Sequence, residues 1–393
     1  MSENNKQVIV VGAGFGGIAA ALRARACGHD VTLVERLSQI GGRAQTFQKD
    51  GFKHDAGPTV ITAPFLFDEL FALFDKNAND YYTAVPLDTW YEYIFEDNRK
   101  FRYSGNLEDT YEEIRKFDEN DIKGYQALLK TSEKIFDIGF TQLAAKPFTS
   151  FVQMVKLIPK LIKLRSYKTV YQLVASYIKN PYLRKVFSMH PLLVGGNPYS
   201  TTSIYTLIHY LERKWGIHFI MGGTSALVSS LEKLMREEGI KIRTRFDVAN
   251  IKINQQTKRV TEVIDTDGNV LKADLVIYNG DPSYAYQNLF SQMLSKPFSM
   301  KPAALTQYSM GLFVLYFGTT RKYDEVAHHT IWLGKRHKEL LRDIFEHKKL
   351  TEDFSLYVHR PTATDASFAP ENCDSFYVLC PVPNLQSGTD WRT

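Results

Sequence analysis

The apolar residues near the start of the chain come in short unbroken runs. QVIVV (7–11) is such a run, typical of a β-strand that is buried on both faces. IAAALRARACG (18–28) has the alanine-rich composition of a helix that ends at Gly28, and HDVTLVER (29–36) predicts a second buried strand. Together the three segments predict a strand–helix–strand unit of the Rossmann type.

Between the first strand and the helix lies a glycine-rich turn, VGAGFGG (11–17), with the spacing G-x-G-x-x-G. Gly12 would permit the tight turn, Gly14 would let the backbone approach a pyrophosphate, and Gly17 would let the helix pack closely on the strand. The helix N-terminus would offer N–H groups and a partial positive charge to the phosphates. The turn therefore predicts a dinucleotide site.

The residues at the end of the second predicted strand indicate which dinucleotide would bind. Glu35 would accept hydrogen bonds from ribose hydroxyls and repel a 2′-phosphate, whereas the adjacent Arg36 could contact such a phosphate. We predict an adenine dinucleotide other than NADP. SQIGGRAQTF (38–47) adds a second glycine pair followed by Arg43, which the simple NAD fingerprint lacks, and this favours FAD.

Two later segments would complete the nucleotide-binding domain, which is therefore split in sequence. MGGTSALVSSLEKLMREEG (221–239) has apolar residues at helical spacing, and LKADLVIYNGD (271–281) contains another buried strand. We predict an α/β protein with three parts: a Rossmann-like FAD-binding domain (1–75 and 216–292), a mixed-sheet substrate domain (76–125 and 293–393) and a helical, membrane-associating lobe (126–215).

The segment 148–180 is basic and contains no acidic residue. It predicts basic amphipathic helices that are interrupted at Pro159. One interpretation is a face that binds anionic lipid and admits a lipophilic substrate, and the other is an ordinary solvated helical surface. No apolar run approaches the roughly 20 residues that a membrane-spanning helix needs. The basic residues of the segment 148–180 that would face the lipid are Lys156, Lys160, Lys163, Arg165 and Lys168.

Composition excludes several other classes of protein. The 393 residues carry a net charge of +5, which is too small to argue for nucleic acid but suits an acidic membrane surface. The three cysteines have no paired spacing, so a disulfide framework is not expected. No HExxH, CxxC or GxSxG motif is present. His328 and His329 are adjacent in a predicted strand and would point to opposite faces, so we predict no metal site.

Beyond these patterns, the sequence resembles a known family. VVGAGFGG, VERLSQIGGRAQT and FKHDAGPTVI are similar to the flavin-binding amine oxidase and carotenoid desaturase superfamily. The closer similarity is to the bacterial-type phytoene desaturases, and it extends from residue 7 to about residue 385. The segments that carry it are HPLLVGGNPYSTTSIYTLIHYLERKWGIHF (190–219), MGGTSALV (221–228), LFVLYFG (312–318), AHHTI (327–331) and EDFSLYVHRPTATD (352–365).

The resemblance implies how FAD would bind. The first glycine turn would hold the pyrophosphate, Glu35 the adenosine ribose, and the second turn would lie by the phosphates and the flavin. The segment after FKHDA would pass near the isoalloxazine ring. Val248 has two interpretations: its main chain would contact the adenine, or it is an ordinary strand residue without a role in binding. The predicted cofactor-binding residues are Gly12, Ala13, Gly14, Phe15, Gly16, Gly17, Glu35, Arg36, Gly42, Arg43, Gly57, Pro58, Thr59, Val60 and Val248.

The resemblance also implies a reaction. The substrate would be phytoene or a related polyene, bound in an apolar tunnel. Each step would transfer a hydride from an allylic carbon to the flavin and lose a proton from the neighbouring carbon, giving lycopene after several steps. Oxygen or a quinone would reoxidise the flavin, and the enzyme would lie peripherally on the cytoplasmic side of the membrane. No catalytic base is identified: His209 and Glu212, one helical turn apart, are interpreted as a packed or solvated pair.

Three alternatives stay open. The chain could be a related FAD enzyme that acts on carotenoids, such as an isomerase, saturase or ketolase, or it could be an amine oxidase. It could also be a catalytically silent flavin-fold protein that binds lipid or carotenoid. Members of the family continue past the position of Thr393 to a further glycine-rich segment that packs on the flavin, and nothing here matches it. We therefore expect the chain to be either a fragment or a truncated product, unstable or weakly flavinated, of a parent protein that is an active desaturase. The oligomeric state is not predicted.

Overall fold

A computed structural model describes residues 5–142, 151–289 and 307–392, without the side chains of 151–156. Two compact units are each built from two stretches of chain: Met1–Val85 with Phe219–Gln307, and Pro86–His218 with Tyr308–Thr393. The helices of the predicted lobe 126–215 thus belong to the same unit as most of the predicted substrate segments, whereas residues 76–85 belong to the first unit. Residue 293, where the second predicted substrate segment begins, and residues 148–150 of the basic segment lie outside the described residues.

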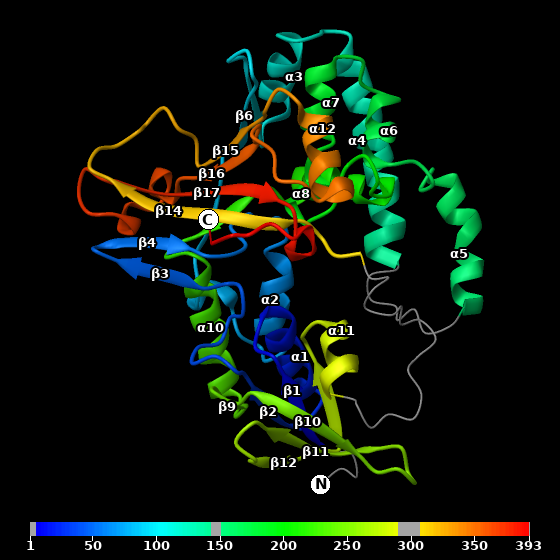
Figure 1. Cartoon of the computed structure of the whole chain (residues 1–393), viewed down its shortest axis with the longest axis vertical. Coiled ribbons are helices and arrows are strands. Elements are labelled where there is room, and N and C mark those ends of the chain that lie inside the picture. Colours follow the sequence, from blue (N-terminus) through cyan, green and yellow to red (C-terminus); the bar gives the residue numbers. More distant parts are fainter. Residues whose placement is uncertain (1–4, 143–150, 290–306, 393) are drawn as a thin grey trace. The chain divides into compact units, whose positions relative to one another are not determined.

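A parallel four-stranded sheet forms the centre of the first unit (Figure 1). Its order is β13-β1-β2-β9, and Val8 lies opposite both Val31 and Leu275. This arrangement places the carboxyl ends of β1, β2 and β13 at one edge. The strands are β1 (Gln7–Val11), β2 (Asp30–Val34), β9 (Lys241–Arg243) and β13 (Leu275–Tyr278).

Both faces of this sheet are buried, which explains the unbroken apolar runs. Val8 and Val10 belong to a core cluster that includes residues of the helices α1, α2 and α10, whereas Ile9 and Val11 belong to a cluster with β10 and β11. Alternate side chains of one strand therefore enter two different cores. The helices are α1 (Phe15–Ala26), α2 (Phe65–Ala72), α10 (Thr224–Glu237) and the short α11 (Pro282–Tyr284).

Two further sheets of the first unit are antiparallel. A three-stranded sheet has the order β10-β11-β12, and β3 and β4 form a hairpin. The short strands β5 and β8 lie where the sequence passes between the units. The bounds are β3 (Thr46–Lys49), β4 (Phe52–Asp55), β5 (Ala84–Pro86), β8 (His218–Ile220), β10 (Val248–Ile253), β11 (Val260–Asp265) and β12 (Val270–Lys272).

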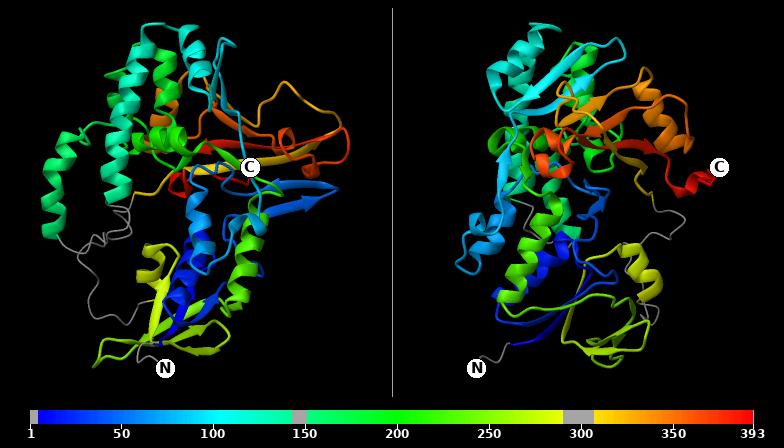
Figure 2. Two further views of the ribbon diagram at one scale, coloured as in Figure 1. Left: turned by 180° about the vertical axis from the view of Figure 1, so that it is seen from behind. Right: turned by 90° about the vertical axis from the view of Figure 1, so that its left-hand side faces the viewer.

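The second unit contains a six-stranded mixed sheet of order β14-β17-β16-β15-β6-β7, in which only β15 and β6 run parallel. In both ribbon figures, helices α3, α4, α6 and α7 gather beside this sheet (Figures 1 and 2). The strands are β6 (Thr89–Ile94), β7 (Lys100–Ser104), β14 (Gly311–Thr319), β15 (His329–Trp332), β16 (Leu356–His359) and β17 (Asp374–Val382).

Helices make up much of this unit, and α4 packs on α9 and on α3. The basic helix α5 continues through Pro159, so the predicted interruption there is wrong. Pro159 is exposed, and water can satisfy the carbonyl that loses its helical partner. The helices are α3 (Leu107–Arg115), α4 (Asp121–Phe136), α5 (Phe151–Lys163), α6 (Val170–Ala175), α7 (Pro181–Phe187), α8 (His190–Leu193), α9 (Leu207–Trp215) and α12 (His337–Arg342).

Aromatic side chains fill the core between β7 and the helices. Tyr125 and Phe187 stack with ring centroids 4.6 Å apart, and both contact Tyr103. The Arg213 guanidinium lies 4.6 Å from the centroids of both the Trp90 and the Tyr103 rings, and it donates a 2.7 Å hydrogen bond to the Ser104 carbonyl. Part of the 13% aromatic content of the chain therefore belongs to this core.

Glu212 on α9 is fully buried and not solvated. Its carboxylate lies 2.9 Å from His190 Nε2 and accepts a 3.1 Å hydrogen bond from the Tyr91 hydroxyl. His209 bonds instead to the Phe187 carbonyl, and burial holds its pKa well below the ordinary value. The two residues that sequence spacing places one helical turn apart thus have separate partners.

No helix among the described residues has both the length and the apolarity to cross a membrane.

Asp121 provides a test of the second unit. This buried carboxylate at the start of α4 accepts hydrogen bonds of 2.8 and 2.7 Å from the main-chain N–H groups of Lys179 and Asn180. Asp121→Ala removes the acceptor from both amides, and we expect it to lower the free energy of unfolding by about 2–4 kcal/mol in urea titrations. Asp109→Ala is the matched control, since Asp109 is an exposed first-turn aspartate of α3 and should change stability by less than about 1 kcal/mol. Equal losses would contradict the assigned role.

Candidate functional site

The first glycine turn joins β1 to α1 at the carboxyl edge of the parallel sheet. Gly12 has φ of +94° and donates a 2.8 Å hydrogen bond to the Val34 carbonyl. Gly14 is the N-cap of α1, and no side chain caps this helix. A Cβ atom on Gly17 would lie 1.9 Å from the Gly12 oxygen, so only glycine lets the helix start this close to the turn. The N-terminal N–H groups of α1 therefore face the edge without a competing side chain.

The second glycine turn packs directly on the first. Gly41 donates a 2.7 Å hydrogen bond to the Ala13 carbonyl, and a Cβ on Gly42, whose φ is +60°, would lie 3.1 Å from Gly14 Cα. A Cβ on Gly57 would lie 2.0 Å from the Arg43 oxygen. Three segments that are separate in sequence thus meet main chain to main chain. Arg43 itself is exposed beside them.

Glu35 is buried at the end of β2, where it faces the first turn. One carboxylate oxygen accepts a 2.8 Å hydrogen bond from the Ala13 N–H and the other a 3.0 Å bond from the Leu37 N–H. Each oxygen can accept a second hydrogen bond, so the anchored carboxylate can still receive ribose hydroxyls. Arg36 is exposed.

The structure also brings the predicted adenine segment to this edge. The Phe246 N–H donates a 2.9 Å hydrogen bond to the Glu35 carbonyl, and Val248 packs in the same core cluster as Val11 and Val34. This places the main chain around Val248 near the end of β2, although its side chain serves as a core residue as well.

The segment Gly57–Val60 follows the β3–β4 hairpin, and Asp55 anchors it. The buried Asp55 carboxylate accepts hydrogen bonds from the Thr46 hydroxyl (2.9 Å) and from the N–H of Thr224 (3.1 Å), at the start of α10. Thr59 is buried and Pro58 exposed. The predicted flavin-side residues are therefore held on the same unit as the two glycine turns.

Asn279 is a site residue that the sequence analysis missed. It follows β13, and its N–H donates a 2.8 Å hydrogen bond to the Val11 carbonyl. A Cβ on Gly16 would lie 2.5 Å from Asn279 Oδ1, so this amide covers the first glycine turn. The available signal was the polar residue at the end of a buried strand parallel to β1, because the carboxyl ends of such strands share one edge.

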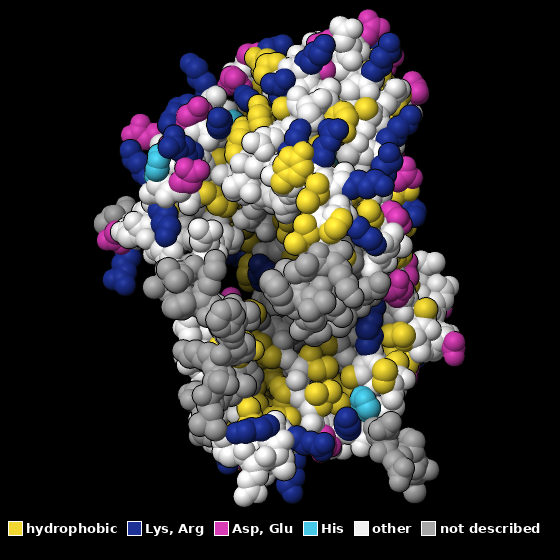
Figure 3. Space-filling model, turned by 90° about the vertical axis from the view of Figure 1, so that its right-hand side faces the viewer, with side chains coloured by type: hydrophobic (Ala, Val, Ile, Leu, Met, Phe, Trp, Pro, Cys, Tyr) yellow, Lys and Arg dark blue, Asp and Glu magenta, His cyan; other side chains and the backbone are white. Residues whose placement is uncertain are grey.

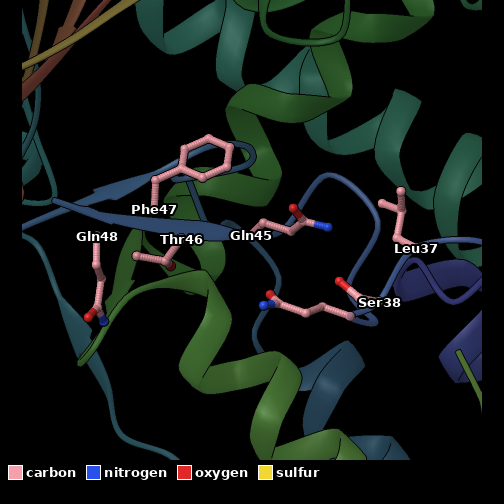
Figure 4. Close-up of a pocket in the computed structure, with 7 residues that line it drawn as sticks. Leu37, Ser38, Gln45, Thr46, Phe47 and Gln48 are labelled. Carbon is pink, nitrogen blue, oxygen red and sulfur yellow. The ribbon is translucent and has the colours of Figure 1, made fainter. Parts of the chain in front are cut away.

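An open pocket of about 290 Å³ lies beside the second glycine turn (Figure 4). Leu37 and Ser38 come from the loop after β2, and the other labelled side chains come from the start of the β3 hairpin. Five of its seven lining residues have polar side chains, and the other two are Leu37 and Phe47. The lining residues are Leu37, Ser38, Gln39, Gln45, Thr46, Phe47 and Gln48.

The parallel sheet, the two interlocked glycine turns and the buried glutamate define a dinucleotide-dependent oxidoreductase of the flavoprotein class. The family profile described as flavin containing amine oxidoreductase matches residues 15–355, and the chain belongs to this family.

Curated relatives and a solved structure extend this comparison. The chain is 42% identical to a lycopene-forming phytoene desaturase of Pantoea ananas, over 98% of this chain and 78% of the relative. It is 35% identical to a neurosporene-forming phytoene desaturase of Rhodobacter capsulatus, over 100% of this chain and 76% of the relative. An oxidoreductase from Methanosarcina mazei has the same fold, with a TM-score of 0.63 at 19% identity over 96% of this chain and 79% of that one.

The cofactor of this enzyme is FAD. The residues present fit it: the crowded glycines leave main chain and the Asn279 amide at the phosphate edge, and Glu35 is oriented there by two main-chain N–H groups. We propose that the fifteen predicted cofactor residues, together with Asn279, form the FAD site.

Gly14→Ala tests the pyrophosphate contact. Gly14 has φ of −73°, and an added Cβ would meet only Asn279 Nδ2, at 3.4 Å, so the fold should tolerate alanine. The methyl group would occupy the space where a phosphate approaches. We expect an unchanged melting temperature without cofactor and an FAD dissociation constant raised about tenfold or more, equivalent to about 1.4 kcal/mol, in flavin fluorescence titrations.

Gly139→Ala is the matched control, because it adds the same methyl in the other unit at an ordinary 3.4 Å contact with Leu207. Its FAD affinity should equal that of the unmodified chain. An unchanged affinity in Gly14→Ala would show that the pyrophosphate does not bind over this glycine.

Proposed function

We propose that this enzyme uses FAD to desaturate phytoene to more conjugated carotenes, with lycopene as the final product. The observation that carries the proposal is the similarity to a lycopene-forming phytoene desaturase over nearly the whole chain. The choice of product is supported by the lower identity to the neurosporene-forming relative.

Each desaturation removes two hydrogens from a CH–CH unit. FAD, when bound, supplies the acceptor for the hydride that leaves the allylic carbon, and a proton leaves the adjacent carbon as the double bond forms. The roles of the chain's own residues would be binding and orientation: the two glycine turns would hold the pyrophosphate, Glu35 would hold the ribose, and Gly57–Val60 would orient the ring. Oxygen or a quinone takes the electrons in the oxidative half of the cycle.

We further propose that the enzyme lies peripherally on the cytoplasmic side of a membrane, because its hydrocarbon substrate dissolves in the interior of the bilayer and not in water. The described part of α5 and the turn after it supports this. Ile158 and Ile162, which are 47% and 59% exposed, lie four residues apart, and Lys160 and Lys163 are exposed around them. Exposed apolar side chains among lysines are typical of a helix that lies in a membrane interface. Figure 3 shows Lys and Arg interspersed with hydrophobic side chains on the face turned to the viewer.

The activity is tested directly with the purified full chain, reconstituted with FAD and given phytoene in liposomes under air or with a quinone. We expect coloured carotenes, with lycopene accumulating, when the products are separated by chromatography. Omission of FAD and the Gly14→Ala variant at low FAD concentration should both reduce the yield.

The alternatives have their own readouts in the same experiment. Peroxide release from amines without carotene formation would favour an amine oxidase. Retention of phytoene unchanged by a chain that holds FAD would contradict the proposed reaction and favour a silent binding protein.

Membrane association is tested by co-sedimentation with anionic liposomes at low salt. Lys160→Glu with Lys163→Glu should weaken binding by about 1 kcal/mol or more for each lysine, on the order of thirtyfold for the pair. Lys123→Glu with Lys130→Glu is the matched control, since these lysines are exposed on α4 and carry the same charge change. Equal binding by both double variants would overturn the assignment to α5.

A further inference from the structure

Three buried histidines, His328, His329 and His359, meet at one end of the β15–β16 pair in the second unit. His329 and His359 lie opposite each other in the antiparallel register, and His328 precedes β15. The ring centroids are 4.5 Å apart for His328 and His329, 4.9 Å for His328 and His359, and 5.2 Å for His329 and His359. The prediction that His328 and His329 point to opposite faces is therefore wrong, because the strand alternation begins only at His329.

The cluster has the composition of a metal site. Each histidine offers one ring nitrogen, and these three nitrogens all lie within 4.8 Å of one another. Three nitrogens bound to a tetrahedral Zn²⁺ at about 2.0–2.1 Å would be about 3.3 Å apart, so the rings need to close by at most about 1.5 Å. Side-chain rotation alone can supply such a movement.

A second set of contacts orients the rings. The Nδ1 atom of His328 lies 2.7 Å from the Thr364 hydroxyl, and the Nδ1 atom of His329 lies 2.7 Å from the Tyr357 hydroxyl. The Arg360 N–H, next to His359, donates a 2.9 Å hydrogen bond to the His328 carbonyl and ties the two segments together. Metal-binding histidines commonly have this arrangement, in which one ring nitrogen is held by an outer polar group and the other is directed to the ion.

The electrostatic state of the rings agrees with this geometry. All three are at most 6% exposed, and burial lowers the pKa of His328 to about 3 and those of the other two well below the ordinary value. The rings are therefore neutral at physiological pH, which is the form that binds metal. The nearby Arg360 guanidinium lies 3.5 Å from the Asp374 carboxylate, which offsets its charge.

We propose that His328, His329 and His359 form a binding site for a divalent cation of the Zn²⁺ class, which fastens the segment before β15 to the end of β16. Three neutral imidazoles without a carboxylate favour Zn²⁺, Co²⁺ or Ni²⁺ over the harder Mg²⁺ and Ca²⁺. The site lies within the second unit and is separate from the residues of the glycine turns. Its role is structural, and it does not depend on the proposed reaction.

The test uses the untagged full chain. The protein is treated with a chelator, incubated with excess Zn²⁺, desalted and measured for metal content by mass spectrometry. We expect about one Zn²⁺ per chain, a higher melting temperature than that of the metal-free protein, and visible absorption bands of tetrahedral Co²⁺ when cobalt replaces zinc. A wild-type chain that retains no zinc and shows no such cobalt bands would overturn the proposal.

Two variants assign the metal to these residues. His329→Gln with His359→Gln should lose the bound zinc, whereas His347→Gln should retain it, because His347 is half-exposed on another segment and pairs with Asp343. Thr364→Val keeps the three ligands and the side-chain volume, and it should weaken zinc binding by about 10–100-fold through loss of the outer hydrogen bond. Unchanged zinc content in the double histidine variant would also overturn the proposal. Should that variant not fold, the Thr364→Val affinity and the wild-type cobalt bands decide the outcome.

Discussion

The direct contact of main chain with main chain at the glycine turns is the constraint on which the nucleotide-binding unit depends. At Gly17 and at Gly57 a single added carbon would lie about 2 Å from a carbonyl oxygen. No rearrangement of side chains relieves such an overlap, because the obstructing atoms belong to the backbone itself. The edge of the parallel sheet is consequently lined by peptide groups, whose N–H groups can match the shape and charge of a phosphate chain.

The features that could be predicted from sequence are those with a local cause. A strand that is buried on both faces needs an unbroken apolar run wherever it lies in the sheet. The run QVIVV therefore predicts burial on both faces without information on the neighbouring strands. The glycine spacing likewise reflects contacts within a few residues of the turn. Glu35 could be predicted because it stands at the end of the strand that follows the glycine turn and its helix. In the structure its carboxylate accepts a hydrogen bond from the Ala13 N–H.

The features that were missed arise from pairing between distant segments. Asn279 reaches the first turn only because β13 lies beside β1, and His359 meets His329 only through the register of β16 against β15. Glu212 was noticed, but its partner His190 lies before α9 and is brought to it by the fold of the helices. Spacing along one helix describes neighbours on that helix and carries no information on what packs against it. Pro159 shows that a local rule can also fail. A proline is expected to interrupt a helix, but α5 continues through this exposed position.

The placement of β13 next to β1 also determines when the parallel sheet can form while the chain is being synthesised. Strand β1 is made first, but its second neighbour and the helix α10 that covers the sheet follow only after residue 218. At about 5–20 residues per second, the ribosome needs on the order of ten seconds or more to add the intervening unit. During that interval the nascent N-terminal strands expose apolar faces and an unpaired edge. The parallel sheet can therefore be completed only after β13 has been made, late in the translation of this chain.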